Sequence, residues 1–342
     1  MVRDFGITEK GEKTRLYELR NVNGMTVCVS DYGATVVSVN VPGQDGRVRD
    51  VVLGYDCARD YEAGGQSFGA TVGRVANRIG GARFSLNNQT YILVQNDNGN
   101  NLHSGPDIYN HRQWEVEEAD ERHAVFHLFS PDGDQGYPGS LDITVTYSLD
   151  DGNGLMIHYE AEAEADTLVN MTNHSYFNLN GHDSGDVLEQ KLWLEADAYT
   201  RADRESIPTG EIVDVAGTPM DFRTGKPVGR DIQADYEALN FAGGYDHNWV
   251  LNGGGFRKVG GFSCEESGIS MYIYTDMPGM QVYSGNFLAH ERGKEGALYE
   301  KHQGICFETQ YFPDAVNKDN FVSPIVKAKE KAVSDTSYVF EF

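Results

Sequence analysis

Apolar and polar residues alternate in short runs along most of the chain. In the segment 155–163, Leu, Ile, Tyr, Ala and Ala occupy every second position, and Met, His, Glu and Glu lie between them. A period of two is typical of a β-strand with one buried face. Such runs predict strands at Thr26–Ser30, Thr35–Val41, Arg83–Leu86, Ala124–Phe129, Leu141–Ser148, Leu155–Ala163, Gln190–Glu195, Ser270–Thr275, Met280–Ser284 and Ile305–Gln310.

Helical periodicity is scarce, and its best candidate is the short segment Ile232–Phe241. The acidic stretch Glu115–Arg122 is typical of a solvated hairpin. Because no linker, low-complexity tract or internal repeat divides the chain, we expect residues 1–342 to form one all-β, antiparallel domain with few short helices. Gly, Asn, Asp and Pro mark turns between the strands at 42–46, 130–139, 149–154 and 251–255.

Composition supports a β-rich protein and limits its partners. The 342 residues include 39 Gly, 19 Tyr and 16 Phe, which suit turns and pleated surfaces. Acidic residues outnumber basic ones by 52 to 28, which gives a net charge of −24. Nucleic acids and anionic membranes are bound through basic patches, so we expect neither as a partner. A neutral small molecule fits this charge better than a phosphorylated one.

The cysteines and the N-terminal residues indicate the compartment. Cys28, Cys57, Cys264 and Cys306 are widely spaced and form no CxxC pair, so we expect free thiols in a reducing environment. The first residues lack the apolar stretch of a signal peptide. No apolar run approaches the roughly 18 residues that a membrane span requires. We therefore expect a cytoplasmic protein.

Two segments hold candidate acid–base chemistry. In 173–179, a period of two places His174 and Tyr176 on one strand face. His174 is then either a surface or hydrogen-bonded core residue, or part of a site. Glu308 lies among apolar neighbours and shares a face with Cys306. On an edge strand this carboxylate would face water, whereas in a buried cleft it would be a natural general base.

The remaining polar residues are ambiguous when each is considered alone. Arg74 and Arg78 could bind a phosphate or pair with acidic side chains, and the glycines around them do not match a nucleotide-binding loop. His103 and Asp246 are compatible with the capping of turns. No metal-ligand spacing and no GxSxG motif is present. The residues by themselves thus indicate a β-rich protein that binds a neutral polar ligand.

Taken together, several motifs resemble the aldose 1-epimerase, or galactose mutarotase, family along nearly the whole chain. This resemblance implies a large antiparallel β-supersandwich with one active-site cleft and no metal or organic cofactor. It also implies an isomerase that interconverts the α and β anomers of free hexoses, such as D-galactose and D-glucose, by ring opening and reclosure. The motifs are DVVLGYD (50–56), GRVANRI (73–79), PDGDQGYPG (131–139), NHSYFNL (173–179), PGMQVYSGN (278–286) and FETQYFPDAVN (307–317).

The resemblance also assigns roles to single residues. His174 corresponds to the general acid and Glu308 to the general base. Ser104 and Tyr245 stand where the family often has Gly and Phe, and each adjoins an expected sugar-binding residue, so they bear on sugar preference more than on chemistry. The expected sugar-binding residues are Asn77, Arg78, His103, Tyr176, Asp246 and Gln281.

Other functions remain compatible with the sequence. A silent sugar-binding or sensor protein would be expected to lack Glu308 or His174, and both are present. A hexose-6-phosphate epimerase would need additional basic residues near its pocket. A glycoside hydrolase would use two opposed carboxylates, for which Asp246 and Glu308 could serve; a polysaccharide lyase is a weaker variant of that idea. The sequence does not distinguish a monomer from a homodimer.

Overall fold

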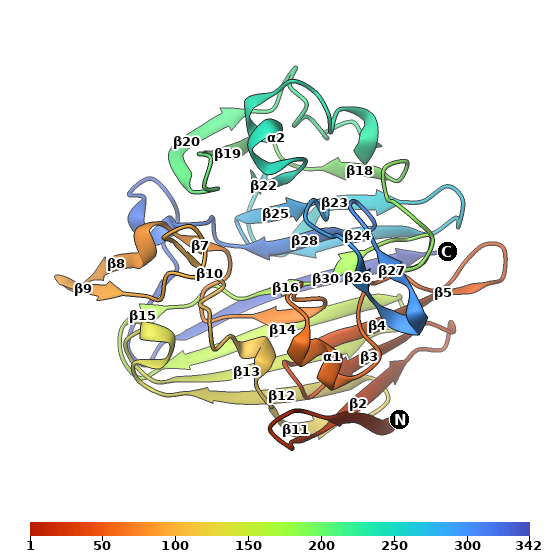
Figure 1. Cartoon of the computed structure of the whole chain (residues 1–342), viewed down its shortest axis with the longest axis horizontal. Helices are drawn as coiled ribbons and strands as arrows, with labels where there is room; N and C mark the ends of the chain where they lie inside the picture. Colours follow the sequence, from red (N-terminus) through yellow and green to blue (C-terminus); the bar gives the residue numbers. More distant parts are fainter.

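A computed structural model describes residues 1–342 as layers of antiparallel β-sheet (Figure 1). The largest sheet has nine strands, and its long central strands β13, β14 and β30 pair over their full lengths. In sheet order its strands are β11 (Glu115–Ala119), β12 (His123–Ser130), β13 (Leu141–Leu149), β14 (Gly154–Ala163), β30 (Lys331–Glu341), β24 (Ser270–Thr275), β23 (Arg257–Ser263), β18 (Lys191–Leu194) and β21 (Lys226–Pro227).

One face of a six-stranded sheet packs against this nine-stranded sheet. Tyr338 of β30 donates a hydrogen bond to the carbonyl oxygen of Phe307 at 2.8 Å, and the hydroxyls of Thr309 and Thr336 are 2.5 Å apart. The apolar residues between the sheets belong to the main hydrophobic core. In order, the strands of the six-stranded sheet are β17 (Tyr176–Phe177), β28 (Ile305–Gln310), β25 (Gly279–Tyr283), β22 (Asp246–Val250), β19 (Ala198–Ala202) and β20 (Pro208–Asp214).

The N-terminal residues form a third sheet of five strands, which lies against the nine-stranded sheet where the ring of Tyr17 contacts that of Phe126. Its strands are β1 (Val2–Ile7), β2 (Lys13–Arg20), β3 (Thr26–Ser30), β4 (Thr35–Pro42) and β5 (Val48–Asp50). Five two-stranded ladders complete the sheets: β6 (Ala70–Val72) with β16 (Thr172–His174), β7 (Arg78–Ile79) with β10 (Asn101–Leu102), β8 (Arg83–Leu86) with β9 (Gln89–Ile92), β15 (Thr167–Leu168) with β29 (Ile325–Val326), and β26 (Glu291–Arg292) with β27 (Leu298–Tyr299).

Helices are few and short. The two α-helices have six residues each, α1 (Ala58–Ala63) and α2 (Glu237–Ala242). None of the helices is long and apolar enough to cross a membrane. Single 3-10 turns occur at Gly80–Ala82, Tyr109–His111, Asp134–Gly136, Val228–Arg230, Lys294–Gly296 and Ala315–Asn317.

The all-β prediction is confirmed, as are the predicted strands. In β14 the five residues from Leu155 to Ala163 at alternate positions are buried, and their neighbours are half-buried or exposed. The acidic stretch after Glu115 forms the predicted hairpin between β11 and β12. The predicted helix begins later than Ile232, because the chain makes turns at Asp231–Ala234 before α2. All four cysteines are free thiols.

Candidate active site

Glu308 lies on an inner strand of the six-stranded sheet, second from its edge. Its strand β28 pairs with β17 on one side and β25 on the other, so the possibility of a solvent-facing edge strand is excluded. Phe307 and Thr309 point to the nine-stranded sheet, which places Cys306 and Glu308 on the opposite face. The side chain of Glu308 is buried, and its Oε2 has no hydrogen-bond partner. Such a carboxyl group is available for a ligand.

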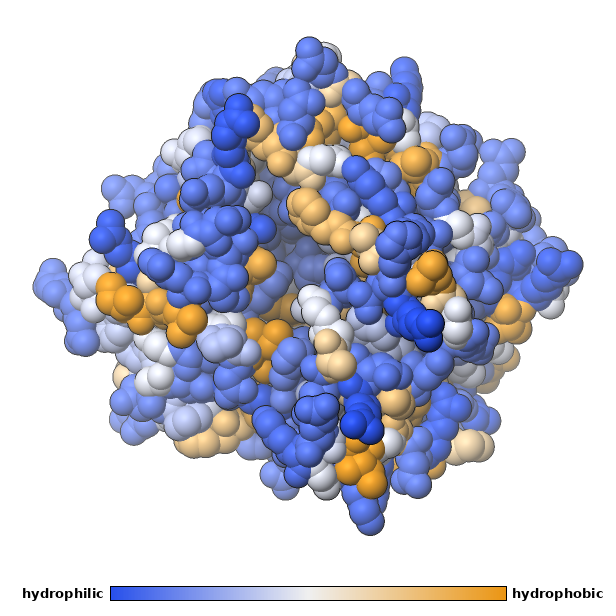
Figure 2. Space-filling view, viewed as in Figure 1, coloured by the Kyte–Doolittle hydropathy of each residue, from blue (hydrophilic) through white to orange (hydrophobic).

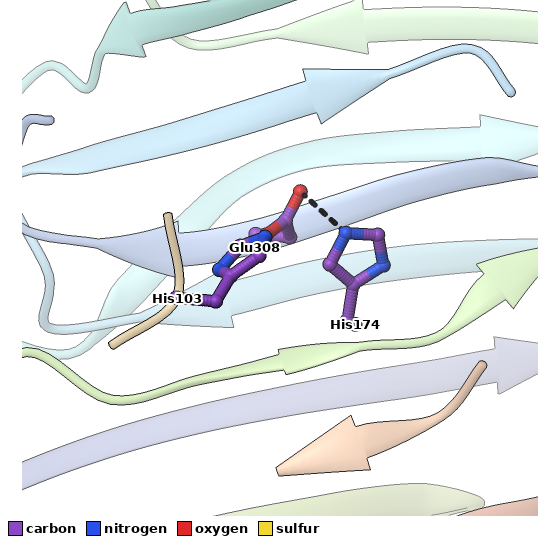
Figure 3. A group of neighbouring side chains, drawn as sticks. All are labelled: His103, His174 and Glu308. Carbon is purple, nitrogen blue, oxygen red and sulfur yellow. Dashed lines mark ion pairs between the residues drawn. The ribbon is translucent and has the colours of Figure 1, made fainter. Parts of the chain in front are cut away.

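His174 and Tyr176 face Glu308 from two neighbouring strand segments. His174 ends β16, and pairing is interrupted at Ser175 before β17 begins at Tyr176. The Nε2 atom of His174 lies 3.6 Å from Oε1 of Glu308 (Figure 3). The rings of His174 and Tyr176 are 5.1 Å apart, so the predicted shared face is confirmed. The hydroxyl of Tyr176 donates to the carbonyl oxygen of Gln66 at 3.1 Å.

These groups line a pocket of about 210 Å³, and Figure 2 shows a hollow near the middle of this face of the molecule. Of the eight predicted site residues, seven line it, which brings together positions as distant as 77 and 308. The remaining lining residues were not predicted. Tyr283 could have been found, since a period of two places it on the same strand face as Gln281. The complete lining is Gly65, Gln66, Ser67, Asn77, Arg78, Leu102, His103, His174, Tyr176, Asp246, Tyr283, Phe287 and Glu308.

Gln281 is the predicted residue that does not line the pocket. Its Nε2 donates a hydrogen bond of 2.6 Å to Oδ1 of Asp246 on the adjacent strand β22. It is also opposite Glu308 in the register of β25 and β28. Gln281 therefore orients the carboxylate of Asp246, and a direct contact with a sugar stays a prediction.

Asn77 and His103 are joined by two hydrogen bonds, one between backbone groups and one to the imidazole of His103. The amide of Asn77 donates to Nδ1 of His103 at 3.1 Å, and the amide of His103 donates to the carbonyl oxygen of Asn77 at 3.0 Å. Both residues have left-handed backbone torsions, with φ of 61° and 53°. This exchange of hydrogen bonds fixes two short loops beside the carboxyl group of Glu308.

The two arginines of segment 73–79 have different roles. Nε of Arg78 donates to Oδ2 of Asp97 at 2.7 Å, an ion pair that holds the guanidinium at the pocket. Arg74 is fully buried and donates to carbonyl oxygens of Pro138 and Gly139 at 3.0 and 2.9 Å. Arg74 is thus structural, and its partners are not the carboxylates that the sequence suggested.

Burial shifts the proton equilibrium of the acid–base pair. Desolvation raises the pKa of Glu308 well above its ordinary value, and the negative charge of Asp246 adds to this effect while Arg78 opposes it. Desolvation lowers the pKa of His174 to about 4. In the free protein at neutral pH, the neutral imidazole is therefore favoured over the imidazolium, the form in which a histidine acts as a general acid.

Three side chains come close enough together to consider a metal. The donor atoms of His103, His174 and Glu308 all lie within 4.8 Å of one another. A metal-bound histidine usually donates the hydrogen of its second ring nitrogen. In His103, however, Nδ1 accepts a hydrogen bond from the amide of Asn77, so Nε2 carries the ring hydrogen. The set suits hydrogen bonding to hydroxyl groups better than coordination of a metal.

The two positions that differ from the common family residues lie outside the pocket. Ser104 is fully buried, where its hydroxyl donates to the carbonyl oxygen of Val75 at 3.0 Å and accepts from the Val75 amide at 2.8 Å. Tyr245 is also fully buried, and its hydroxyl donates to the carbonyl oxygen of Pro219 at 3.0 Å. Both side chains therefore act on the scaffold rather than on the lining of the pocket.

Comparison with known proteins agrees with this geometry. The aldose 1-epimerase family model matches residues 15–339. Aldose 1-epimerase of Escherichia coli K12 is 38% identical over 335 residues, 96% of each chain. Galactose mutarotase of Bos taurus is 39% identical over 322 residues, 92% of this chain and 91% of its own. The crystal structure of a GalM/aldose epimerase homologue from C. elegans superimposes with a TM-score of 0.90 at 31% identity, covering 96% of this chain and 99% of the homologue. The chain belongs to the aldose 1-epimerase family.

Proposed function

We propose that this protein is an aldose 1-epimerase that interconverts the α and β anomers of free hexoses such as D-galactose and D-glucose. The observation that carries this proposal is the buried pair of His174 and Glu308, whose Nε2 and Oε1 atoms lie 3.6 Å apart in a polar pocket. Family membership over nearly the whole chain supports the same activity.

The reaction requires two coordinated proton transfers. During ring opening, Glu308 takes the proton of the O1 hydroxyl, the bond between C1 and the ring oxygen breaks, and His174 gives a proton to that oxygen. The C1–C2 bond then rotates, and the reverse transfers close the ring on the other face of the aldehyde. The pair holds one transferable proton throughout. In the favoured neutral state of the free protein this proton is on Glu308; it passes to Nε2 of His174 before ring opening and is replaced on Glu308 by the O1 proton during that step. Each positioned acid or base contributes about 10²–10⁴-fold.

The surrounding groups hold the open-chain sugar during rotation. Asp246 accepts hydrogen bonds from hydroxyls, whereas Arg78 and the Nε2–H of His103 donate them. Gln281 keeps the carboxylate of Asp246 in place. These roles and the cytoplasmic location stay predictions, and neither a monomer nor a homodimer is favoured.

The pocket gives less support to the alternative reactions. Arg78 is the one Lys or Arg side chain in its lining and is already paired with Asp97, so a sugar phosphate would have little to bind. In a hydrolase, Asp246 would have to act as a second catalytic carboxyl, but its Oδ1 is held by Gln281. Glu308 is instead placed against an imidazole, which suits an acid–base pair.

Polarimetry tests the proposal directly. Freshly dissolved α-D-glucose and α-D-galactose should lose their initial rotation faster with protein than without it, in a buffer that catalyses the change weakly. The acceleration should rise in proportion to the protein concentration. Methyl glycosides, which cannot open their rings, should be unaffected. A folded protein that accelerates neither free sugar, or that cleaves the glycosides, would overturn the proposal.

Replacing Asp246 should weaken sugar binding. We expect Asp246→Ala to raise KM for galactose by about 10- to 100-fold, since a hydrogen bond to a charged group is removed. Cys57→Ala is the control, because Cys57 precedes α1 and does not line the pocket. Initial rates over a range of sugar concentrations give both KM values, and equal values for the two variants would refute the proposed role of Asp246.

A further inference from the structure

One strand contacts both ring nitrogens of His174. The Sγ atom of Cys306 lies 3.5 Å from Nδ1, and Oε1 of Glu308 lies 3.6 Å from Nε2. Cys306 and Glu308 are two residues apart on β28, so their side chains leave the same face of the strand. The thiol is fully buried and does not line the pocket, so it acts on the reaction through neighbouring side chains, and its sulfur lies against the ring of His174.

The proposed reaction decides which nitrogen must keep its hydrogen. Nε2 faces Glu308 and has to gain and lose a proton in every cycle. A neutral imidazole carries one hydrogen, so after Nε2 has released its proton the remaining hydrogen must be on Nδ1. The opposite tautomer would leave Nε2 with its hydrogen and no capacity to accept one. An acceptor beside Nδ1 favours the productive tautomer, and the sulfur of Cys306 is in that place.

We propose that Cys306 is a positioning residue whose Sγ accepts the Nδ1–H of His174, which leaves Nε2 as the ring nitrogen that exchanges protons with the sugar. The proposal rests on the acid–base function proposed above and extends it. Sulfur is a weak acceptor, and a neutral thiol adds no charge that would stabilise the imidazolium. A thiol at this position therefore orients the ring while leaving its acidity high. A carboxylate there would orient the ring and also reduce its acidity.

Other groups around the ring could also influence its protonation. Burial lowers the pKa of His174 to about 4, whereas the backbone carbonyl of His174 itself and the negative charge of Asp246 favour the charged ring. Burial also raises the pKa of the Cys306 thiol, which keeps the sulfur protonated and neutral at physiological pH. The titratable and charged groups facing the ring are Cys306 and Glu308 from β28, His103, Tyr176, Tyr283, Asp246 and, at the pocket lining, Arg78.

The direct test is the tautomer of His174 in the free protein. ¹⁵N NMR of histidine-labelled protein at pH 7, with His174→Gln used to assign the signal, should show a protonated Nδ1 and an unprotonated Nε2. A ring that carries its hydrogen on Nε2 would overturn the proposal. Because this measurement uses no sugar, it is independent of whether the protein proves to be an epimerase.

Three variants of Cys306 provide the kinetic test. Cys306→Ala removes the acceptor and should lower kcat about three- to tenfold, the effect of one ordinary hydrogen bond. Cys306→Ser keeps an acceptor and should restore kcat to near the wild-type value. Cys306→Asp should move the acid limb of the kcat/KM profile upward by about 1–3 pH units. Cys264→Ala, the loss of another buried thiol outside the pocket, should change neither quantity.

The outcomes of the variants separate positioning from packing. If Cys306 only fills space, Cys306→Ala and Cys306→Ser should lose stability to different degrees while the acid limb stays in place. Equal kcat values for the Ala variant and the wild type, or equal losses in Ala and Ser, would contradict the proposal. Should Cys306→Asp fail to fold, the comparison of Ala with Ser and the ¹⁵N spectrum still decide between the two roles.

Discussion

Glu308→Gln is expected to lower kcat for anomer exchange by about 10²–10⁴-fold, the usual contribution of one general base. The amide preserves the size of the side chain but cannot take the proton of the O1 hydroxyl. Binding of the sugar should change less than kcat, since the hydrogen-bonding residues around the pocket remain. Polarimetry on galactose at several concentrations separates the two quantities.

The stability of this variant serves as its control for folding. Folding raises the pKa of Glu308. The contribution of this residue to stability is therefore present at pH values below its pKa in the unfolded state, and it is lost as the pH rises through its pKa in the folded state. A neutral amide avoids that loss, and we expect Tm at pH 7 to equal or exceed the wild-type value. Glu265→Gln changes an exposed glutamate and should leave kcat unchanged. A kcat within fivefold of wild type for Glu308→Gln would refute the role of Glu308.

His174→Ala is expected to have a loss of similar size, about 10²–10⁴-fold in kcat, because no group remains to protonate the ring oxygen. The shape of the pH profile should change as well. In the wild type, kcat/KM should fall at low pH with a limb near 4, where His174 gains a proton while Glu308 is already protonated. It should fall again at high pH, where the pair loses its one transferable proton.

In the His174→Ala variant, the bell-shaped dependence of kcat/KM on pH should be reduced to a single limb. The residual activity depends on Glu308 alone, which acts as a base only when ionised, so the rate should rise with pH through the raised pKa of Glu308. Because the two groups interact, the wild-type limbs belong to the pair rather than to either residue. Rates in constant-ionic-strength buffers across the pH range test this, and a variant that retained both limbs would show that another residue supplies the acid.

Local patterns predicted ten of the thirty strands, including the long β13 and β14, and missed the central strand β30. The alternation in Leu155–Ala163 and the turns around it identify β14, since a period of two reports a buried face independently of the partner strand. The same rule placed His174 and Tyr176 together. The helix α1 was missed because only two of its six residues, Ala58 and Tyr61, are buried, which is too few apolar positions to show a helical period.

Distances between residues far apart in sequence could not be predicted from local patterns. Whether Glu308 faced water or a cleft depended on the strand order β17-β28-β25, which is a property of the assembled sheet. The same assembly turned Gln281 toward Asp246. It also buried Ser104 and Tyr245, which were expected beside the pocket because each adjoins a predicted site residue in the sequence. The motifs shared with the aldose 1-epimerase family pointed to seven residues that line the pocket, without giving their geometry.

The sequence by itself determined the type of fold and the chemical groups available, because periodicity and residue type are local properties. The tertiary structure decided how those groups behave. Burial in the sheet moves the pKa of His174 and that of Glu308 in opposite directions, so that the neutral pair is favoured in the free protein. Desolvation depends on everything packed around a charge, and Cys306 lies beside Nδ1 of His174 only after β16 and β28 have come together.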